Sequence, residues 1–146
     1  MRTSNIYVTV DAVIFRESIS DIEILLIRRK NAPFQGDWAL PGGFVNHHED
    51  LDKAAMRELE EETGLSGIVL SQFHTFGTPH RDPRGHTVSV AYIGLAARNA
   101  NAIAADDASE AVWFSVKKLP ALAFDHSDII SIALKLKYGI SNTKMG

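Results

Sequence analysis

The sequence contains no cysteine among its 146 residues. This absence excludes disulfide bonds, thiolate metal sites and cysteine nucleophiles, and it is typical of proteins kept in a reducing cytoplasm. The sequence also lacks any apolar run approaching the length of about eighteen residues that a membrane-spanning helix needs. Its N-terminus has neither the charged region nor the apolar region of a signal peptide. We therefore expect a cytoplasmic protein without a membrane partner.

A basic cluster is missing as well. The formal net charge is -3 at pH 7, and the longest basic run is Arg28-Arg29-Lys30. This run is too short for a nucleic-acid-binding patch, so nucleic acid is not an expected partner. The hydrophobic fraction of 45% and the charged fraction of 23% are typical of a globular protein. We expect a single domain over residues 1–146, in which residues 141–146 form a frayed tail.

Segments of alternating and β-branched residues predict strands, and helical spacing of apolar residues predicts two helices. Asp50 and Gly64 are expected to cap the first helix, and Ser127 the second. This order predicts an α/β fold, a mixed β-sheet with helices packed on its faces. The expected strands are residues 6–15, 22–29, 38–40, 68–78, 87–97 and 111–115, the expected helices are residues 51–63 and 127–138, and residues 116–122 are expected to form a helical turn.

The stretch from Gly43 to Leu65 gathers carboxylates at the helix end where they are least favoured. Glu61 and Glu62 lie three and four residues after Glu58, so the three side chains converge on one patch. The helix macrodipole disfavours negative charge there. Such a patch is either a fully solvated acidic face or a cation site, and clustered carboxylate oxygens suit Mg²⁺ or Mn²⁺. In the second case the carboxylates would form a preassembled cation site.

The same stretch satisfies a longer pattern: glycine, five residues, glutamate, seven residues, then Arg-Glu-apolar-x-Glu-Glu-x-Gly-apolar. This pattern resembles the signature of the Nudix hydrolases, and the preceding segment of residues 38–42 is also similar to that family. The matching positions are Gly43, Glu49, Arg57, Glu58, Leu59, Glu61, Glu62, Gly64 and Leu65.

The resemblance implies an α/β/α sandwich with a mixed β-sheet between helices. It also implies hydrolysis of a nucleoside diphosphate linked to another moiety, with Mg²⁺ as cofactor and Mn²⁺ as a possible substitute. Arg57 and Glu49 would pair and hold the loop against the helix. His47 and His48 fall at free positions of the pattern and are expected to be solvated turn residues; zinc ligation is the alternative. Carried over by position, the implied metal ligands are Glu58, Glu62, Glu61 and the carbonyl of Gly42, with Glu61 either a direct ligand or a partner that contacts the ligands.

Further catalytic and binding residues are expected outside the signature. Family members often use a general base from a remote loop, and the candidates here are Asp106, Asp107 and Glu110, with Glu61 as the competing choice. Arginines can bind phosphate bidentately, and the candidate substrate contacts are Arg29, Arg81 and Arg84. The aromatic residues that could stack on a nucleobase are Phe15, Phe34, Trp38, Phe76 and Tyr92.

The substrate is suggested by features after the helix. Pro79, residues 81–85 and residues 119–126 resemble a bacterial branch that holds ADP-ribose pyrophosphatases and related regulators of NAD metabolism. The resemblance implies hydrolysis of ADP-ribose to AMP and ribose 5-phosphate. Modified nucleoside triphosphates, dinucleoside polyphosphates and NADH are the alternative substrates, and a non-catalytic nucleotide-sugar sensor is the alternative of another class. A homodimer is also implied, with residues 6–15 either as an interface strand or as a core strand.

Overall fold

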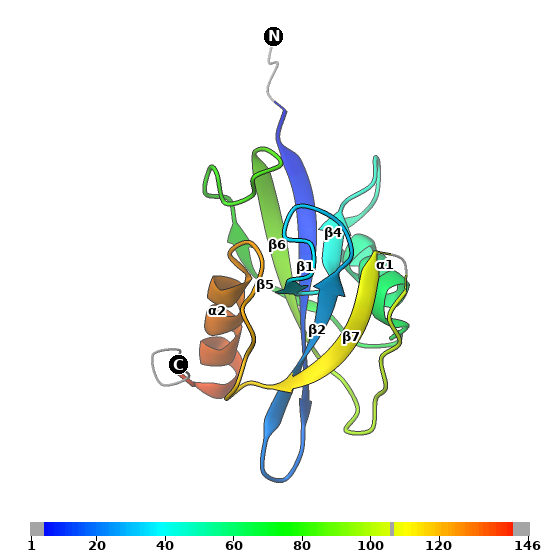
Figure 1. Ribbon diagram of the computed structural model, residues 1–146, viewed down its shortest axis with the longest axis vertical. Coiled ribbons are helices and arrows are strands. Elements are labelled where there is room, and N and C mark those ends of the chain that lie inside the picture. The colour runs from blue at the N-terminus through cyan, green and yellow to red at the C-terminus, as the bar shows by residue number, and fades with distance from the viewer. Residues whose placement is uncertain (1–4, 106, 142–146) are drawn as a thin grey trace.

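The computed structural model describes residues 5–105 and 107–141. These residues form a seven-stranded mixed sheet with one helix on each side (Figure 1). The predicted α/β class, with the sheet between helices, is thereby confirmed. The strands are β1 (Tyr7–Glu17), β2 (Ile22–Arg29), β3 (Trp38–Ala39), β4 (Gly42–Phe44), β5 (Ser71–Phe76), β6 (Thr87–Leu95) and β7 (Ala108–Ser115), and the helices are α1 (Leu51–Thr63) and α2 (His126–Tyr138).

Strand β1 lies at the centre of the sheet. Its residues Tyr7–Phe15 pair in parallel with β6, and β5 pairs antiparallel with β6. Its pairing with β2 is confined to Phe15–Glu17. Beyond these residues the two strands diverge, and β4 pairs with Thr9–Asp11 of β1, while β2 pairs with β3 and β7. The divergence of β1 from β2 determines where the site described below can form.

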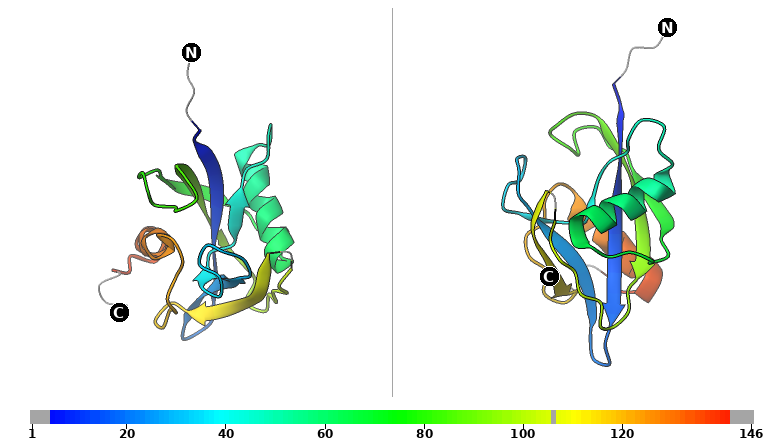
Figure 2. Two further views of the ribbon diagram at one scale, coloured as in Figure 1. Left: turned by 45° about the horizontal axis from the view of Figure 1, so that its top comes forward. Right: turned by 90° about the vertical axis from the view of Figure 1, so that its right-hand side faces the viewer.

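Side chains of β1 alternate between the two helices, as the pleat of a strand requires. Val13 and Phe15 belong to the cluster that α2 covers, together with Ile130 and Leu134. On the other face, Val10 packs with the two alanines of α1. Figure 2 shows the two helices on opposite sides of the sheet. Residues 6–15 were expected to form either an interface strand or a core strand, and the structure shows that β1 is largely a core strand.

Helix α1 begins and ends where its capping residues predict. The side chain of Asp50 accepts a hydrogen bond from the backbone N–H of Lys53, and Gly64 adopts a left-handed conformation with φ of 74°. Gly64 also donates its backbone N–H to the carbonyl of Glu60 at 2.8 Å. These contacts satisfy backbone groups that would otherwise lack partners at the helix ends.

Several predicted boundaries are wrong. Helix α2 begins at His126, so Ser127 lies inside it and does not cap it. Strand β7 begins at Ala108, three residues before the predicted start at 111. Residues 116–122 form a turn and extended chain rather than a helical turn, because Pro120 lacks an N–H and disfavours helical backbone before it. The predicted frayed tail falls mostly outside the described residues, apart from Ser141. Neither described helix has the length and apolar character needed to cross a membrane.

Candidate active site

A cavity of about 420 Å³ opens where β1 and β2 diverge. Alternate residues of a strand share one face. Thr9 and Asp11 of β1 and Ile27 and Arg29 of β2 follow this spacing, and all four line the cavity. Helix α1 contributes Glu58 and Glu62. The other lining residues are Asn31, Ala32, Leu40, Gly42, Gly43, Phe44, Asn46, Arg81, Asp82, Arg84, Asp107, Phe124 and His126.

Glu62 is the most buried carboxylate of α1, with 6% of its surface exposed. Its Oε1 accepts a hydrogen bond from the backbone N–H of Gly42 at 2.7 Å. Burial raises the pKa of Glu62 to about 8, the Gly42 N–H opposes this shift, and the nearby carboxylates of Glu58 and Asp11 add to it. A carboxylate in this environment binds a proton near neutral pH unless a cation compensates its charge. The residues present therefore fit a bound divalent cation.

The two glycines of β4 allow close approach on two sides, Gly42 to β1 and Gly43 to the Glu58 carboxylate of α1. A Cβ on Gly42 would meet the carbonyl oxygen of Val10 at 2.1 Å, and a Cβ on Gly43 would meet Oε2 of Glu58 at 2.6 Å. Both distances are far below van der Waals contact, so larger residues would displace either the sheet pairing or the Glu58 carboxylate. Residue 43 is a position of the sequence pattern, and its requirement for glycine follows from this contact.

Arg57 connects three carboxylates to β4. Its guanidinium binds Glu49 through two hydrogen bonds of 2.7 and 2.9 Å, binds Glu58 at 2.8 Å and reaches the carbonyl of Phe44 at 3.2 Å. The hydrogen bond to Arg57 is the main reason that the pKa of Glu49 falls to about 2. Burial raises the pKa of Glu58, and Arg57 opposes that shift. Arg57 and Glu49, which were expected to pair, thus hold the loop before α1 against the helix.

Glu61 does not join the other two carboxylates of the predicted cation site. Its side chain is 44% exposed, it binds Arg57 at 3.0 Å, and it lies outside the cavity lining. Within residues 5–105 and 107–141, no three His, Asp or Glu side chains lie close enough to hold a metal ion unaided. Glu58 and Glu62 line the cavity, whereas Glu61 turns to Arg57. The cation site on these carboxylates stays a prediction.

Two of the three predicted substrate arginines have guanidinium groups at the cavity. The guanidinium of Arg29 lies 5.0 Å from the ring centroid of Phe124, and its Nε donates to the carbonyl of Pro33 at 2.7 Å. Burial lowers the pKa of Arg29, and the neighbouring charge of Arg84 lowers it further. Arg84 lies 4.5 Å from the ring of Phe44 and 5.1 Å from that of Phe124. Arg84 also pairs with Asp82 at 2.8 Å, and the positive charge of Arg29 beside it favours an anionic ligand in the cavity.

Arg81 has a different environment, although it also lines the cavity. Its side chain is only 5% exposed and makes a two-pronged ion pair with Asp125. A third hydrogen bond, of 3.2 Å, reaches the hydroxyl of Thr87. Arg81 thus ties the loop before β6 to the start of α2. Pro79, in the same loop, lies outside the cavity lining.

Of the candidate general bases Asp107 and Glu110, only Asp107 lies at the cavity. Asp107 lines the cavity, and Oδ1 of Asp107 lies 3.4 Å from the side-chain amide of Asn31. Glu110 pairs with Arg28 at 2.9 Å and is not part of the lining. Asp106 lies outside the described residues. The geometry therefore favours Asp107 over Glu110.

Sequence reasoning missed a buried pair at the cavity, Asp11 and His126. His126 Nδ1 accepts the backbone N–H of Leu40 at 3.0 Å, and its Nε2 lies 3.4 Å from Oδ1 of Asp11. The hydroxyl of Ser89 donates to the other carboxylate oxygen of Asp11. Burial lowers the pKa of His126, and the carboxylate of Asp11 opposes this effect only in part. A charged residue inside the otherwise apolar strand of residues 6–15 was the available signal for Asp11; no local signal singled out His126.

Most of the predicted stacking aromatics belong to the core. Phe15 and Tyr92 have no exposed surface, and Trp38 and Phe76 pack against the cluster under α2. Phe34 is 38% exposed, and its ring centroid lies 4.7 Å from that of Phe124.

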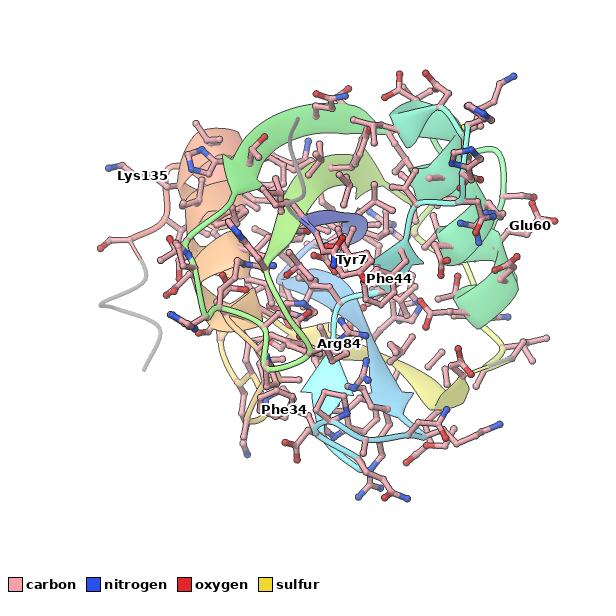
Figure 3. All side chains as sticks on the ribbon, turned by 90° about the horizontal axis from the view of Figure 1, so that it is seen from above. Tyr7, Phe34, Phe44, Glu60, Arg84 and Lys135 are labelled. Atoms are coloured by element: carbon pink, nitrogen blue, oxygen red, sulfur yellow. The ribbon has the colours of Figure 1, made fainter. Side chains whose placement is uncertain are left out.

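The phenyl rings that line the cavity are those of Phe44 and Phe124. In the view from above, Tyr7, Phe44 and Arg84 lie near the centre, Phe34 lies below them, and Glu60 and Lys135 point outward (Figure 3). His47 and His48 are exposed and contact each other.

A family model described as NUDIX domain matches residues 6–133. The chain belongs to the Nudix family. The ADP-ribose pyrophosphatase of Methanocaldococcus jannaschii is 46% identical to this Nudix chain over 132 residues, which cover 90% of this chain and 75% of the relative. The predicted family is thereby confirmed.

Two further relatives carry ADP-ribose in their descriptions. An Acinetobacter baylyi protein called ADPR responsive transcriptional repressor NtrR is 38% identical over 86% of this chain and 52% of the repressor. This Nudix chain thus spans about half the length of the repressor. The NUDIX domain of Shewanella oneidensis NrtR, solved in complex with ADP ribose, superposes with a TM-score of 0.83 at 35% identity and covers 92% of this chain and 90% of that domain.

Proposed function

We propose that this protein hydrolyses ADP-ribose to AMP and ribose 5-phosphate with the help of a divalent cation. The observation that carries the proposal is the arrangement of charges in the cavity. Glu58 and Glu62 of α1 are negative, whereas Arg29 of β2 and Arg84 of the loop before β6 are positive. A diphosphate with a bound cation satisfies both groups, because carboxylates bind the cation and guanidinium groups bind phosphate oxygens. The similarity to the M. jannaschii pyrophosphatase and to the domain bound to ADP ribose supports this substrate.

Glu58 and Glu62 would hold the cation, and the carbonyl of Gly42 is a further candidate ligand. The burial of Glu62 among like charges supports this assignment, since a cation offsets the charge that otherwise raises its pKa. Oxygen ligands favour Mg²⁺, with Mn²⁺ as a substitute. The chemistry that such a cation supplies when bound is neutralisation of phosphate charge and a lower pKa of the attacking water.

The remaining cavity residues would bind and orient the substrate and the attacking water. Arg29 and Arg84 would orient the diphosphate. Arg84 also pairs with Asp82, but its side chain is 35% exposed, whereas Arg81 is 5% exposed and held by Asp125, which makes it a structural support. Asp107 is the proposed acceptor of the proton from the attacking water, because it lines the cavity. Glu61 would have to turn away from Arg57 to perform that role.

The test is release of AMP and ribose 5-phosphate from ADP-ribose by the purified protein with Mg²⁺, followed by chromatography. The Glu62→Gln variant should lose at least about a hundredfold in kcat, since it removes a charged oxygen ligand. Glu60→Gln is the matched control, because Glu60 lies two residues away on α1 and is exposed. Absence of AMP release from the wild-type protein across a range of pH and Mg²⁺ concentrations would refute the proposal.

A substrate panel separates the alternatives within the family. Modified nucleoside triphosphates, dinucleoside polyphosphates and NADH carry the same diphosphate group, which the cavity charges would bind equally well. We expect the highest kcat/KM for ADP-ribose. A higher kcat/KM for a triphosphate than for ADP-ribose would identify the triphosphate as the substrate. The proposed cation site would not be affected by that result.

The second candidate function is sensing of ADP-ribose without turnover. The similarity to the Acinetobacter repressor favours it, and a Shewanella NrtR structure at 36% identity was solved with a 27mer DNA. Turnover discriminates between the two functions: a protein that binds ADP-ribose tightly but releases no AMP is a sensor. Our proposal includes no nucleic-acid partner, and salt-dependent binding to DNA would contradict it.

We also propose a homodimer. Within the predicted interface segment of residues 6–15, the start is the accessible part, because Ile6 and Tyr7 are 49% and 52% exposed whereas Val10 is fully buried. Size-exclusion chromatography with light scattering measures the mass in solution, and a mass near the 16.0 kDa of one chain would refute the dimer.

A further inference from the structure

The outer edge of β4 is bonded to side chains instead of another strand. Ala12 donates its backbone N–H to the carbonyl of Pro41, and the backbone N–H of Val45 donates to Val8, so residues 41, 43 and 45 face β1. Because backbone groups alternate along a strand, residues 40, 42 and 44 face away from it. On that outer edge, His126 accepts the N–H of Leu40, Glu62 accepts the N–H of Gly42, and Arg57 donates to the carbonyl of Phe44.

His126 reaches this edge from α2, on the other side of the sheet from α1. It is 5% exposed and can meet the Leu40 N–H only with an unprotonated Nδ1. The neutral ring then carries its proton on Nε2, which lies 3.4 Å from Oδ1 of Asp11. Asp11 is anchored in turn by the hydroxyl of Ser89. The ring is therefore fixed from both of its nitrogens.

One residue, Pro41, separates the Leu40 N–H held by His126 from the Gly42 N–H that binds Glu62. Loss of the acceptor would leave the Leu40 N–H buried and unpaired, which is costly enough to shift the segment. Any shift of Leu40–Gly42 moves the donor that holds the Glu62 carboxylate at the cavity. A contact made by α2 is thus transmitted to a carboxylate of α1 through one short segment of backbone.

We propose that His126 is a positioning residue, which acts through the backbone of Leu40–Gly42 to orient Glu62 for cation binding. This inference rests on the proposed function, because the cation site on Glu58 and Glu62 is part of it. Outer contacts of metal ligands are typically worth about 10–100-fold in metal affinity or activity. The nitrogen that matters is Nδ1, since it alone contacts the backbone segment.

Two substitutions separate the two nitrogens. In His126→Asn the amide oxygen lies near the place of Nδ1 and can accept the Leu40 N–H. In His126→Gln the amide lies near the place of Nε2, so the contact with Asp11 is kept and the contact with Leu40 is lost. Ile130→Val is the control for weakened packing, because Ile130 lies on the same helix with 1% of its surface exposed.

The readouts are Mn²⁺ affinity by calorimetry without substrate, kcat and KM measured separately, and the melting temperature. We expect His126→Gln to weaken Mn²⁺ binding and lower kcat about tenfold or more with little change in KM. His126→Asn should stay within about threefold of wild type. Ile130→Val should lower the melting temperature without weakening Mn²⁺ binding or lowering kcat. Equal impairment of the Asn and Gln variants, or effects no larger than those of Ile130→Val, would overturn the proposal.

A measurement on the wild-type protein tests the geometry without any variant. The ¹⁵N chemical shifts of the His126 ring should report an unprotonated Nδ1 and a protonated Nε2, and a protonated Nδ1 would overturn the inference. The two proposals can fail separately. Wild-type protein that binds Mn²⁺ but leaves ADP-ribose intact overturns the proposed function alone, whereas normal Mn²⁺ affinity in His126→Gln overturns the positioning role alone. Absence of Mn²⁺ binding overturns both.

Discussion

The backbone N–H of Gly42 donates to Oε1 of Glu62 across 2.7 Å, and this bond joins β4 to the most buried carboxylate of α1. A side chain at residue 42 would disturb the position of this N–H, because its Cβ would meet the carbonyl oxygen of Val10 in β1 at 2.1 Å. Glu62 therefore keeps one partner although burial raises its pKa to about 8. Several consequences of this arrangement can be measured.

The stability of the metal-free protein should depend on pH through Glu62. Its folded-state pKa of about 8 lies above the ordinary value of 4.5. The folded state therefore holds the proton more tightly, and the contribution of Glu62 to the free energy of unfolding is full below pH 4.5 and is lost as pH rises to about 8. We expect a loss of a few kcal/mol over this window, which Glu62→Gln abolishes. Thermal unfolding with a chelator from pH 4.5 to 8.5 measures it, and parallel slopes for the two proteins would contradict the assignment.

Adjacent glycines should respond differently to substitution by alanine. Gly42→Ala sets a Cβ 2.1 Å from a backbone oxygen, so we expect it to destabilise the fold by about 1–3 kcal/mol or more. Gly43→Ala sets a Cβ against the movable Glu58 carboxylate, so it should weaken Mn²⁺ binding with a smaller change in melting temperature. Gly77→Ala is the control, since its nearest contact is an ordinary 3.6 Å. A Gly43→Ala protein with unchanged Mn²⁺ affinity would argue against Glu58 as a ligand.

Neighbouring arginines of β2 should have distinct roles in substrate binding. Arg29→Gln removes a positive charge from the cavity and should raise KM for ADP-ribose about tenfold, which corresponds to one lost charged hydrogen bond. Its melting temperature should not fall much, because repulsion from Arg84 disappears with the charge. Arg28→Gln is the matched control, since Arg28 is about half exposed and pairs with Glu110. Steady-state kinetics measure KM for ADP-ribose in both variants, and equal KM values would refute the role of Arg29.

The two general-base candidates should separate in kinetics. Asp107→Asn should lower kcat by about 10²–10⁴-fold, as expected when a general base is lost. Glu110→Gln should leave kcat near the wild-type value, because that carboxylate lies outside the cavity lining. Steady-state kinetics with saturating ADP-ribose measure both values. An unchanged kcat in Asp107→Asn would make Glu61 the remaining candidate for the base.

Local features of the sequence determined the elements that build this site. Asp50 and Gly64 define the ends of α1 through contacts within a few residues, and β2 spans residues 22–29 as its apolar run predicts. The signature itself predicted which helix carries the carboxylates. These features are readable because capping bonds and side-chain periodicity depend on residues that are neighbours in the chain.

Only the tertiary structure decided which side chains face the cavity. Glu61 and Glu62 are adjacent in sequence, yet one turns to Arg57 and the other is buried against Gly42. The contact between Leu40 and His126 spans 86 residues. Such contacts arise when α1 and α2 pack on opposite faces of the diverging strands. No local pattern reports them, because their energy depends on burial and on partners that the folded chain alone brings together.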